Sequence, residues 1–229
     1  MSKETVLVVA AHPDDEVLGC GGTMAKLAKA GHSVHVAILG EGATSRSAKR
    51  EEADLGEVEK LRMAAREAGK MLGAAKVHLF GFPDNRFDSV PLLDIVKIIE
   101  QLIAELRPSI IFTQHGGDLN IDHVLTQRAV LTAARPLPGA CVKEIYCFEA
   151  PSSTEWSFGQ FEPSFRPNFF VEMASSLEDK LKALSCYESE ERIFPHPRSP
   201  EALRSMARRW GAVVGVPAAE AFEQIRRTI

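Results

Sequence analysis

Hydrophobic positions along the chain follow two alternating patterns. Continuous apolar runs are typical of strands buried on both faces, and apolar residues spaced three and four apart are typical of helices. The strand-like runs are TVLVVAA, HSVHVAILG, KVHLFGF, SIIFTQ and VKEIYCFE. Strands that alternate with helices favour a parallel sheet with right-handed crossovers. We therefore predict an α/β fold, with a Rossmann-like open, mainly parallel sheet and helices on both faces.

The segments between these runs supply the predicted core helices. They are EVLGCGGTMAKLAKAG, VEKLRMAAREAGKMLGA, PLLDIVKIIEQLIAELRP and DHVLTQRAVLTAARPLPG. Residues 40–56 have no apolar period and contain Arg46, Lys49 and Arg50. Long loops in compact domains are often functional lids, so we expect these cations to meet an anionic group of a substrate if the loop covers a site.

The pattern changes after Glu149, where the chain becomes aromatic and rich in turn residues. A short strand, FFVEMA, is then followed by segments with helical spacing. The helices predicted there are Leu177–Tyr187, Pro200–Val214 and Ala218–Arg227. We predict a single domain over residues 1–229, with an α/β core at 1–149 and a C-terminal helical elaboration at 150–229.

Composition excludes several classes of function. The 229 residues carry a net charge of −4, which argues against nucleic acid or an anionic membrane surface as the main partner. No apolar stretch approaches the ~20 residues of a membrane span, so we expect no integral membrane segment. The four cysteines form no C-x-x-C pair, which fits free thiols in a reducing cytoplasm.

Candidate chemistry stands at the end of the first strand, in VLVVAAHPDDEVLGCGG. A dinucleotide fingerprint does not fit, because its third glycine would fall at Met24. Adjacent acids raise one another's pKa, and a bound cation relieves that conflict. His12 and Asp15 are three residues apart on a tight turn and are placed to bind one metal ion from the same side. Asp14 then stays free as a base.

A third ligand is expected from TQHGGDLNIDHVLTQ, which follows the fourth strand and so reaches the same edge of the sheet. The candidates for this ligand are His123, which opens a helix and is therefore held rigidly, and His115, which lies in a glycine-rich loop and is more mobile. Two histidines and one carboxylate with an open position are typical of a catalytic zinc site. Iron(II) binds the same set in oxygenases, so Fe²⁺ stays open as the ion. Asp122 fits either an N-cap or a carboxylate that orients a ligand histidine.

AHPDDEVLGCGG followed by NIDH resembles the LmbE-like (PIG-L) family of zinc-dependent N-acetylglucosaminyl deacetylases. LRMAAREAGKMLG, GFPDN, PHPRS and AEAFE extend the resemblance over most of the chain. It implies removal of the N-acetyl group from an N-acetylglucosamine-type sugar or glycoconjugate, with release of acetate. It also implies that the chain assembles into homo-oligomers, as family members often do.

The resemblance assigns roles to individual positions. The implied metal ligands are His12, Asp15 and His123, the implied base is Asp14, and the implied sugar-binding residues are Arg62 and Asp84. Many family members carry histidine where this chain has Asn120. Either Asn120 donates a hydrogen bond to the oxyanion, or another group replaces that histidine. The alternatives are His115, on the substrate side, and His196, which we favour because prolines flank it.

Three rival functions remain open on the sequence alone. An iron oxygenase fits the ligand set, but the spare Asp14 speaks against it. A phosphoesterase usually needs two metal ions and more carboxylates than the chain offers. A non-catalytic module that binds a sugar or a metal ion is favoured by Asn120 alone.

Overall fold

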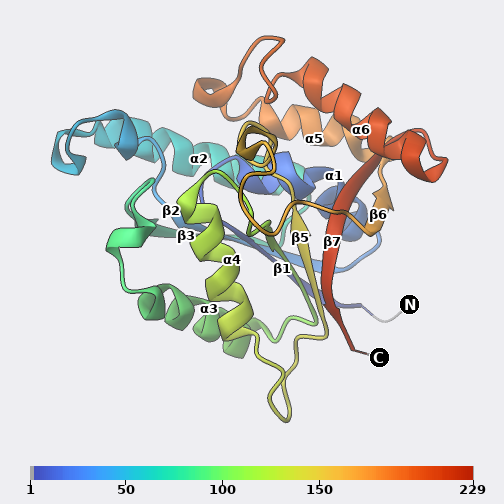
Figure 1. Cartoon of the computed structure of the whole chain (residues 1–229), viewed down its shortest axis with the longest axis horizontal. Helices are drawn as coiled ribbons and strands as arrows, with labels where there is room; N and C mark the ends of the chain where they lie inside the picture. The colour runs from blue at the N-terminus through green and yellow to red at the C-terminus, as the bar shows by residue number, and fades with distance from the viewer. Residues whose placement is uncertain (1–2, 229) are drawn as a thin grey trace.

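The computed structural model describes residues 3–228, and its strands form one sheet (Figure 1). The strand order is β3-β2-β1-β4-β5-β7-β6. The strands are β1 (Thr5–Ala10), β2 (Ser33–Gly40), β3 (Lys76–Phe82), β4 (Ile110–Gln114), β5 (Glu144–Phe148), β6 (Phe169–Glu172) and β7 (Ala219–Arg227). Strands β1 to β5 pair in parallel, whereas β7 is antiparallel to both β5 and β6. The predicted parallel core is therefore confirmed.

Helices cover both faces of this sheet, as predicted. They are α1 (Asp15–Lys29), α2 (Leu55–Met71), α3 (Leu92–Leu106), α4 (Ile121–Ala133), α5 (Leu177–Leu184) and α6 (Pro200–Val214). Figure 1 shows α3 and α4 on one side and the other four helices on the opposite side. The long predicted loop is interrupted by two short 3₁₀ helices, Thr44–Arg46 and Arg50–Glu52, and α2 begins within it, at Leu55.

The central strand β1 is buried on both faces, as its continuous apolar run predicts. Val6 and Val8 pack in the core beneath α1 and α2, whereas Leu7 and Val9 pack against α3 and α4. All four side chains are fully buried, and each such burial stabilises the fold by about 1.5–3 kcal/mol. β1 is thereby held rigidly at the centre of the sheet, which makes its carboxyl end a firm support for functional side chains.

The strand order reverses direction between β1 and β4. β1 is followed across the sheet by β2 on one side and by β4 on the other. In open α/β sheets, ligands bind beyond the carboxyl ends of the strands at such a switch point. The residues that follow β1 and β4 therefore converge at one edge, where the sequence predicts the site.

One element was predicted wrongly. Residues 218–227 were expected to form a helix, but Ala219–Arg227 is the strand β7. Alanine and glutamate favour helices by less than about 1 kcal/mol per residue, and this preference is outweighed by the hydrogen bonds that β7 makes to strands on both sides. The C-terminal elaboration therefore consists of α5 and α6 together with two strands that extend the core sheet.

No helix within residues 3–228 combines the length and the apolar character needed to cross a membrane.

Candidate active site

The turn after β1 aims its two aspartates at different partners. Asp14 has a φ of 99°, in the left-handed region, where a non-glycine residue costs about 1–3 kcal/mol. The Asp15 carboxylate accepts the backbone N–H of His12 at 2.8 Å, which closes the turn. The Asp14 carboxylate instead lies 2.9 Å from the guanidinium of Arg198.

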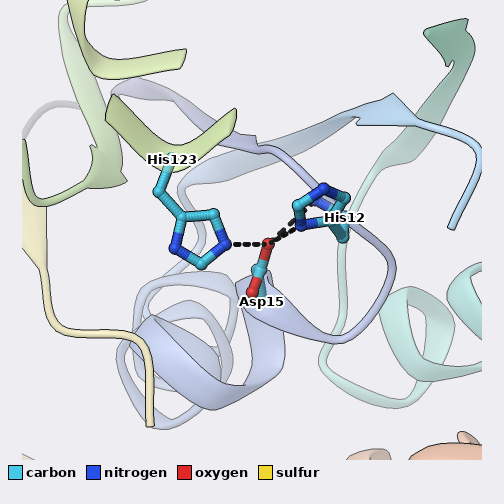
Figure 2. A group of neighbouring side chains, drawn as sticks. All are labelled: His12, Asp15 and His123. Carbon is cyan, nitrogen blue, oxygen red and sulfur yellow. Dashed lines mark hydrogen bonds and ion pairs between the residues drawn. The ribbon is translucent and has the colours of Figure 1, made fainter. Parts of the chain in front are cut away.

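His12, Asp15 and His123 form a group that we call the ligand cluster (Figure 2). Oδ2 of Asp15 lies 3.4 Å from Nδ1 of His12 and 3.3 Å from Nε2 of His123. An ion that binds nitrogen and oxygen at about 2.0–2.2 Å in tetrahedral geometry separates its ligand atoms by about 3.3–3.6 Å. The spacing of the ligand cluster therefore fits a tetrahedral metal ion.

Each histidine of the ligand cluster has a second carboxylate on the other side of its ring. Nε2 of His12 lies 2.9 Å from Oδ2 of Asp122, and Nδ1 of His123 lies 3.2 Å from Oδ1 of Asp118. Metal-binding histidines usually have such partners, which fix the ring orientation and raise ligand basicity. The suggested role of Asp122 as an orienting carboxylate matches this contact, whereas Asp118 was missed.

These acids give the ligand cluster a negative potential. Burial alone would lower the pKa of His123, but Asp15 and Asp118 raise it to about 9. Asp122 and Asp15 likewise outweigh burial and raise the pKa of His12 well above its ordinary value. Burial would raise the pKa of Asp15, but the two imidazoles hold it well below its ordinary value. Such a site favours a cation, whether protons or a metal ion.

Asp14 is electrostatically distinct from its neighbour Asp15. Burial raises the pKa of the Asp14 carboxyl to about 7, although the Arg198 guanidinium opposes the rise. A carboxylate whose pKa lies near neutrality is well matched to general-base catalysis. Asp14 therefore has the position and the chemistry expected of a base beside a metal site.

A cavity of about 160 Å³ opens beside the ligand cluster. Its lining comes from the turn after β1, the loop before α2, the turn after β3, the start of α4 and the segment before α6. The charged side chains that line it are His12, Asp14, Asp15, Arg46, Asp84, Glu190 and Arg198. Acids and arginines therefore face each other across a small polar space.

Asp84, predicted to bind the sugar, and Asn120, predicted to act in catalysis, both line this cavity. Oδ2 of Asp84 accepts hydrogen bonds from the backbone N–H and the hydroxyl of Ser45, at 3.1 and 2.6 Å. Asn120 caps α4, because its Oδ1 accepts the backbone N–H of Asp122 at 2.9 Å. Its amide nitrogen donates to Asn85. Asn120 is therefore placed at the site but already has partners in this arrangement.

Three other predicted residues lie away from the cavity lining. His115 is buried, with its ring nitrogens 2.7 Å from Glu223 and 2.7 Å from the Pro163 carbonyl. Arg62 donates to the backbone carbonyl of Phe80 at 3.4 Å. The His196 ring packs against Trp156, and its Nδ1 accepts the Arg198 backbone N–H. The structure does not bring these three side chains to the ligand cluster, so their functional roles stay predictions.

Two further residues at the site were missed. Arg198 follows His196 by two positions in the sequence and lines the cavity. The PHPRS segment therefore reaches the site, but through its arginine and not through its histidine. Gln114, the last residue of β4, donates to Oδ2 of Asp15 at 2.9 Å. Its position at a strand end beside the switch point was the only signal in the sequence for it.

The loop before α2 closes one side of the cavity. Arg46 lines the cavity and forms an ion pair with the buried Glu190. Arg50 forms a surface ion pair with Glu41, with 2.7 Å between Nε of the arginine and Oε1 of the glutamate. Of the cations proposed for an anionic substrate group, Arg46 alone lines the cavity, and it already has a carboxylate partner.

Curated relatives resemble the chain over most of its length. A deacetylase called YaiS from Escherichia coli K12, whose own function is uncharacterized, is 27% identical over 183 residues, which cover 77% of this chain and 90% of YaiS. Diacetylchitobiose deacetylase from Thermococcus kodakarensis is 27% identical over 201 residues, covering 81% and 69% of the two chains. A 4-oxalmesaconate hydratase from Pseudomonas putida is 27% identical over 213 residues, covering 85% and 77%.

Solved structures share the fold. A conserved protein from Thermus thermophilus superimposes with a TM-score of 0.75 at 27% identity, covering 99% of this chain and 96% of its own. N,N'-diacetylchitobiose deacetylase from Pyrococcus horikoshii gives a TM-score of 0.76 at 22% identity, covering 97% and 84%. The sequence profile of the GlcNAc-PI de-N-acetylase family, PIG-L, matches residues 7–134, which include the whole ligand cluster. The chain therefore belongs to the PIG-L family.

Proposed function

We propose that this protein is a metal-dependent deacetylase that removes the acetyl group from an N-acetylglucosamine-type sugar or glycoconjugate. The observation that carries the proposal is the ligand cluster with Asp14 beside it. The ligand cluster supplies three donor atoms at metal-binding spacing. Asp14 lines the cavity but is not a member of the ligand cluster. Metal-dependent hydrolysis needs a site for the ion, and a separate base beside it speeds the reaction by accepting the proton of the attacking water. The deacetylases among the relatives support the same reaction.

Zinc is the ion that we propose for the ligand cluster. The separations of 3.3 and 3.4 Å support tetrahedral coordination, which zinc adopts with two histidines and one carboxylate. Iron(II) usually has more ligands and therefore smaller angles between them, so it is the second choice.

The chain's own residues supply the proton transfers. A divalent ion held by His12, Asp15 and His123 would lower the pKa of a water molecule and polarise the acetamide carbonyl. Asp14 accepts the proton of the attacking water and then returns it to the departing sugar amine. Asn120 lies on the cavity wall, where its amide nitrogen can donate to the oxyanion once it leaves Asn85. A well-placed donor of this kind contributes about 3–4 kcal/mol.

The size of the cavity limits what part of the substrate enters. At about 160 Å³ it is much smaller than the ~300–1,000 Å³ that hold drug-sized ligands. We infer that the acetamido end of one sugar enters and that the rest of a glycoconjugate stays outside. Asp84 offers carboxylate oxygens to the hydroxyls of that sugar.

A hydratase is the second candidate, since one relative carries that name. Arg46 and Arg198 in the cavity wall favour it, because arginine recognises carboxylates in pairs of hydrogen bonds. Both arginines are already paired, with Glu190 and with Asp14 respectively. We therefore place deacetylation first.

The four cysteines support the expected reducing compartment, because all of them are unpaired. We accordingly propose that the enzyme works in the cytoplasm.

The deciding experiment is an assay of acetate and free amine released from a panel of N-acetylated sugars. The panel spans N-acetylglucosamine, its disaccharide and glycosides with neutral, phosphorylated and lipid aglycones. We expect turnover of at least one compound with zinc-loaded protein, loss on chelation and recovery on adding zinc back. Release of acetate from none of them, together with water addition to an unsaturated dicarboxylic acid, would overturn the proposal in favour of the hydratase.

A further inference from the structure

Arg198 reaches the candidate base from a distant part of the chain. It lies just before Ser199, the residue that caps α6, and is separated from Asp14 by 184 positions. This segment is outside residues 7–134, the part that matches the family profile. The profile match therefore assigns no role to Arg198, and the resemblance of the PHPRS segment to the family gave a role only to His196.

The side chain of Arg198 is held at both ends of its guanidinium. Its Nη1 lies 2.9 Å from Oδ2 of Asp14, and its Nε donates to the hydroxyl of Ser152 at 2.7 Å. Only 24% of the side chain is exposed, and the residue lines the cavity. The Asp14 carboxylate is 3% exposed, so the ion pair is nearly shielded from water on the acid side.

A nearby glutamate does not compete strongly for this arginine. Oε2 of Glu190 is 3.7 Å from Nη1 of Arg198, clearly farther than the Asp14 oxygen. Glu190 also has two other cationic partners, Arg46 and, at 3.6 Å, Arg192. The charge of Arg198 is therefore directed mainly at Asp14.

The arrangement solves a problem inherent in two adjacent aspartates. A divalent cation held by Asp15 also attracts the carboxylate of Asp14, one residue away. A carboxylate that binds the ion cannot accept a proton, so the base would be lost. A cation that pairs with Asp14 competes with the ion for this carboxylate and prevents the loss, provided that it is itself fixed, as Ser152 fixes Arg198.

We propose that Arg198 is the positioning residue for Asp14, and that its guanidinium keeps the Asp14 carboxylate in the cavity and off the metal ion. The inference rests on the proposed function only for the role of Asp14 as base. The position of the carboxylate relative to the ion is a separate matter and can be measured without any substrate.

The first test uses Co²⁺ alone as a probe of coordination. Cobalt(II) absorbs visible light more weakly as its coordination number rises. We expect Arg198→Met to bind one Co²⁺ with weaker visible bands than the wild type, because Asp14 joins the ion. The double variant Asp14→Asn with Arg198→Met is expected to recover the wild-type spectrum. Identical spectra for the wild type and Arg198→Met would overturn the proposal.

The second test separates kcat from KM in the zinc-loaded enzyme. We expect Arg198→Met to lower kcat by about 100-fold with KM within about threefold, because it disturbs a group that acts in the transition state. Arg198→Lys keeps the charge and is expected to recover about tenfold. Adding Arg198→Met to Asp14→Asn is expected to cause no further loss, because residues that act as a unit are non-additive. A raised KM with unchanged kcat would make Arg198 a substrate-binding residue and overturn the proposal.

Two further variants guard against a misfolded protein. Ser152→Ala leaves the Asp14 contact in place but removes the Nε partner, so kcat should fall by about 3–10-fold at unchanged KM. Arg192→Met is the matched control, because Arg192 also pairs with Glu190 and should leave kcat within about twofold. If Arg198→Met does not fold, equal kcat values for Ser152→Ala and the wild type overturn the proposal. Failure of the wild type to deacetylate any sugar would reject the proposed function, while the cobalt spectra would still test Arg198.

Discussion

Asp122 lies 2.9 Å from Nε2 of His12, on the side of the ring away from Asp15. The other oxygen of the same carboxylate accepts the backbone N–H of Phe87, also at 2.9 Å. Asp122 is fully buried, so both contacts hold it in one orientation. With the proton of His12 on Nε2, the lone pair on Nδ1 faces Asp15 and is free for a metal ion.

Replacing Asp122 should therefore weaken metal binding without removing a ligand. We expect Asp122→Asn to bind zinc about 10–100-fold more weakly, the usual cost of losing an orienting carboxylate. Competition with a chelator of known affinity measures the change. Asp88→Asn, at an exposed position of the same 3₁₀ turn as Phe87, is the control. Equal affinities for the two variants would contradict the assigned role.

Two overlapping groups of side chains have metal-binding spacing, and they make different predictions. One is the ligand cluster, and the other consists of His12, Asp84 and Asp122. We expect His123→Ala to lose stoichiometric zinc and Asp84→Asn to retain it, because the ligand cluster supplies two nitrogen donors. Elemental analysis of the purified variants decides between them. The reverse pattern would move the ion to the second group.

Asp14 should be dispensable for metal binding and essential for turnover. We expect Asp14→Asn to keep one metal ion per chain and to lower kcat by about 10²–10⁴, the usual contribution of a general base. Acetate release and metal content are measured on the same sample. Wild-type turnover by this variant would rule out Asp14 as the base.

Gly117 occupies a position where a side chain does not fit. A Cβ atom there would lie 1.8 Å from the carbonyl oxygen of Pro163, which also contacts the His115 ring. We expect Gly117→Ala to destabilise the protein by about 1–3 kcal/mol, as overpacking usually does. Thermal unfolding measures this, with Gly81→Ala as the control, because the nearest atom to its Cβ would be 3.7 Å away. Equal melting temperatures for Gly117→Ala and Gly81→Ala would show that the backbone at Pro163 moves away from the added Cβ atom at little cost in stability.

Glu149 makes the stability depend on pH. Burial raises the pKa of its carboxyl, although the hydrogen bond from Trp210 at 2.5 Å opposes the rise. The folded protein therefore binds this proton more tightly than the unfolded chain. The ionised Glu149 carboxylate is what destabilises the folded protein. This loss of stability is absent below the ordinary pKa of glutamate, grows as pH rises, and is complete above the raised pKa.

Replacing Glu149 removes this dependence and keeps the hydrogen-bond acceptor. We expect Glu149→Gln to unfold at a higher temperature than the wild type at about pH 8 and at the same temperature at about pH 4. Calorimetric melting temperatures across that range test the sign. A variant that is less stable than the wild type at the alkaline end would show that the Trp210 bond outweighs burial.

Local sequence signals decided the structure of some elements but not of others. Pro200–Val214 was predicted with the observed bounds, because Ser199 caps the helix and Gly215 ends it, and both signals are local. The segment after Val216 has good helix formers, yet it becomes β7 because two open strand edges lie beside it. Local preference decides an element only where no stronger partner competes for its backbone.

The buried strand β1, the turn that follows it and the three side chains of the ligand cluster could all be read from the order of the amino acids. Short-range spacing and the rule that parallel strands end at one edge were enough for His12 and Asp15, and they left His115 and His123 as candidates for the third ligand. The resemblance to the PIG-L family selected His123. The packing of the folded chain was needed to place Asp118 behind the His123 ring, to show that Asp122 faces His12, and to bring Arg198 rather than His196 to the cavity. Those contacts join segments that are far apart along the chain, and side-chain direction at such contacts depends on how whole layers pack. No local pattern encodes it.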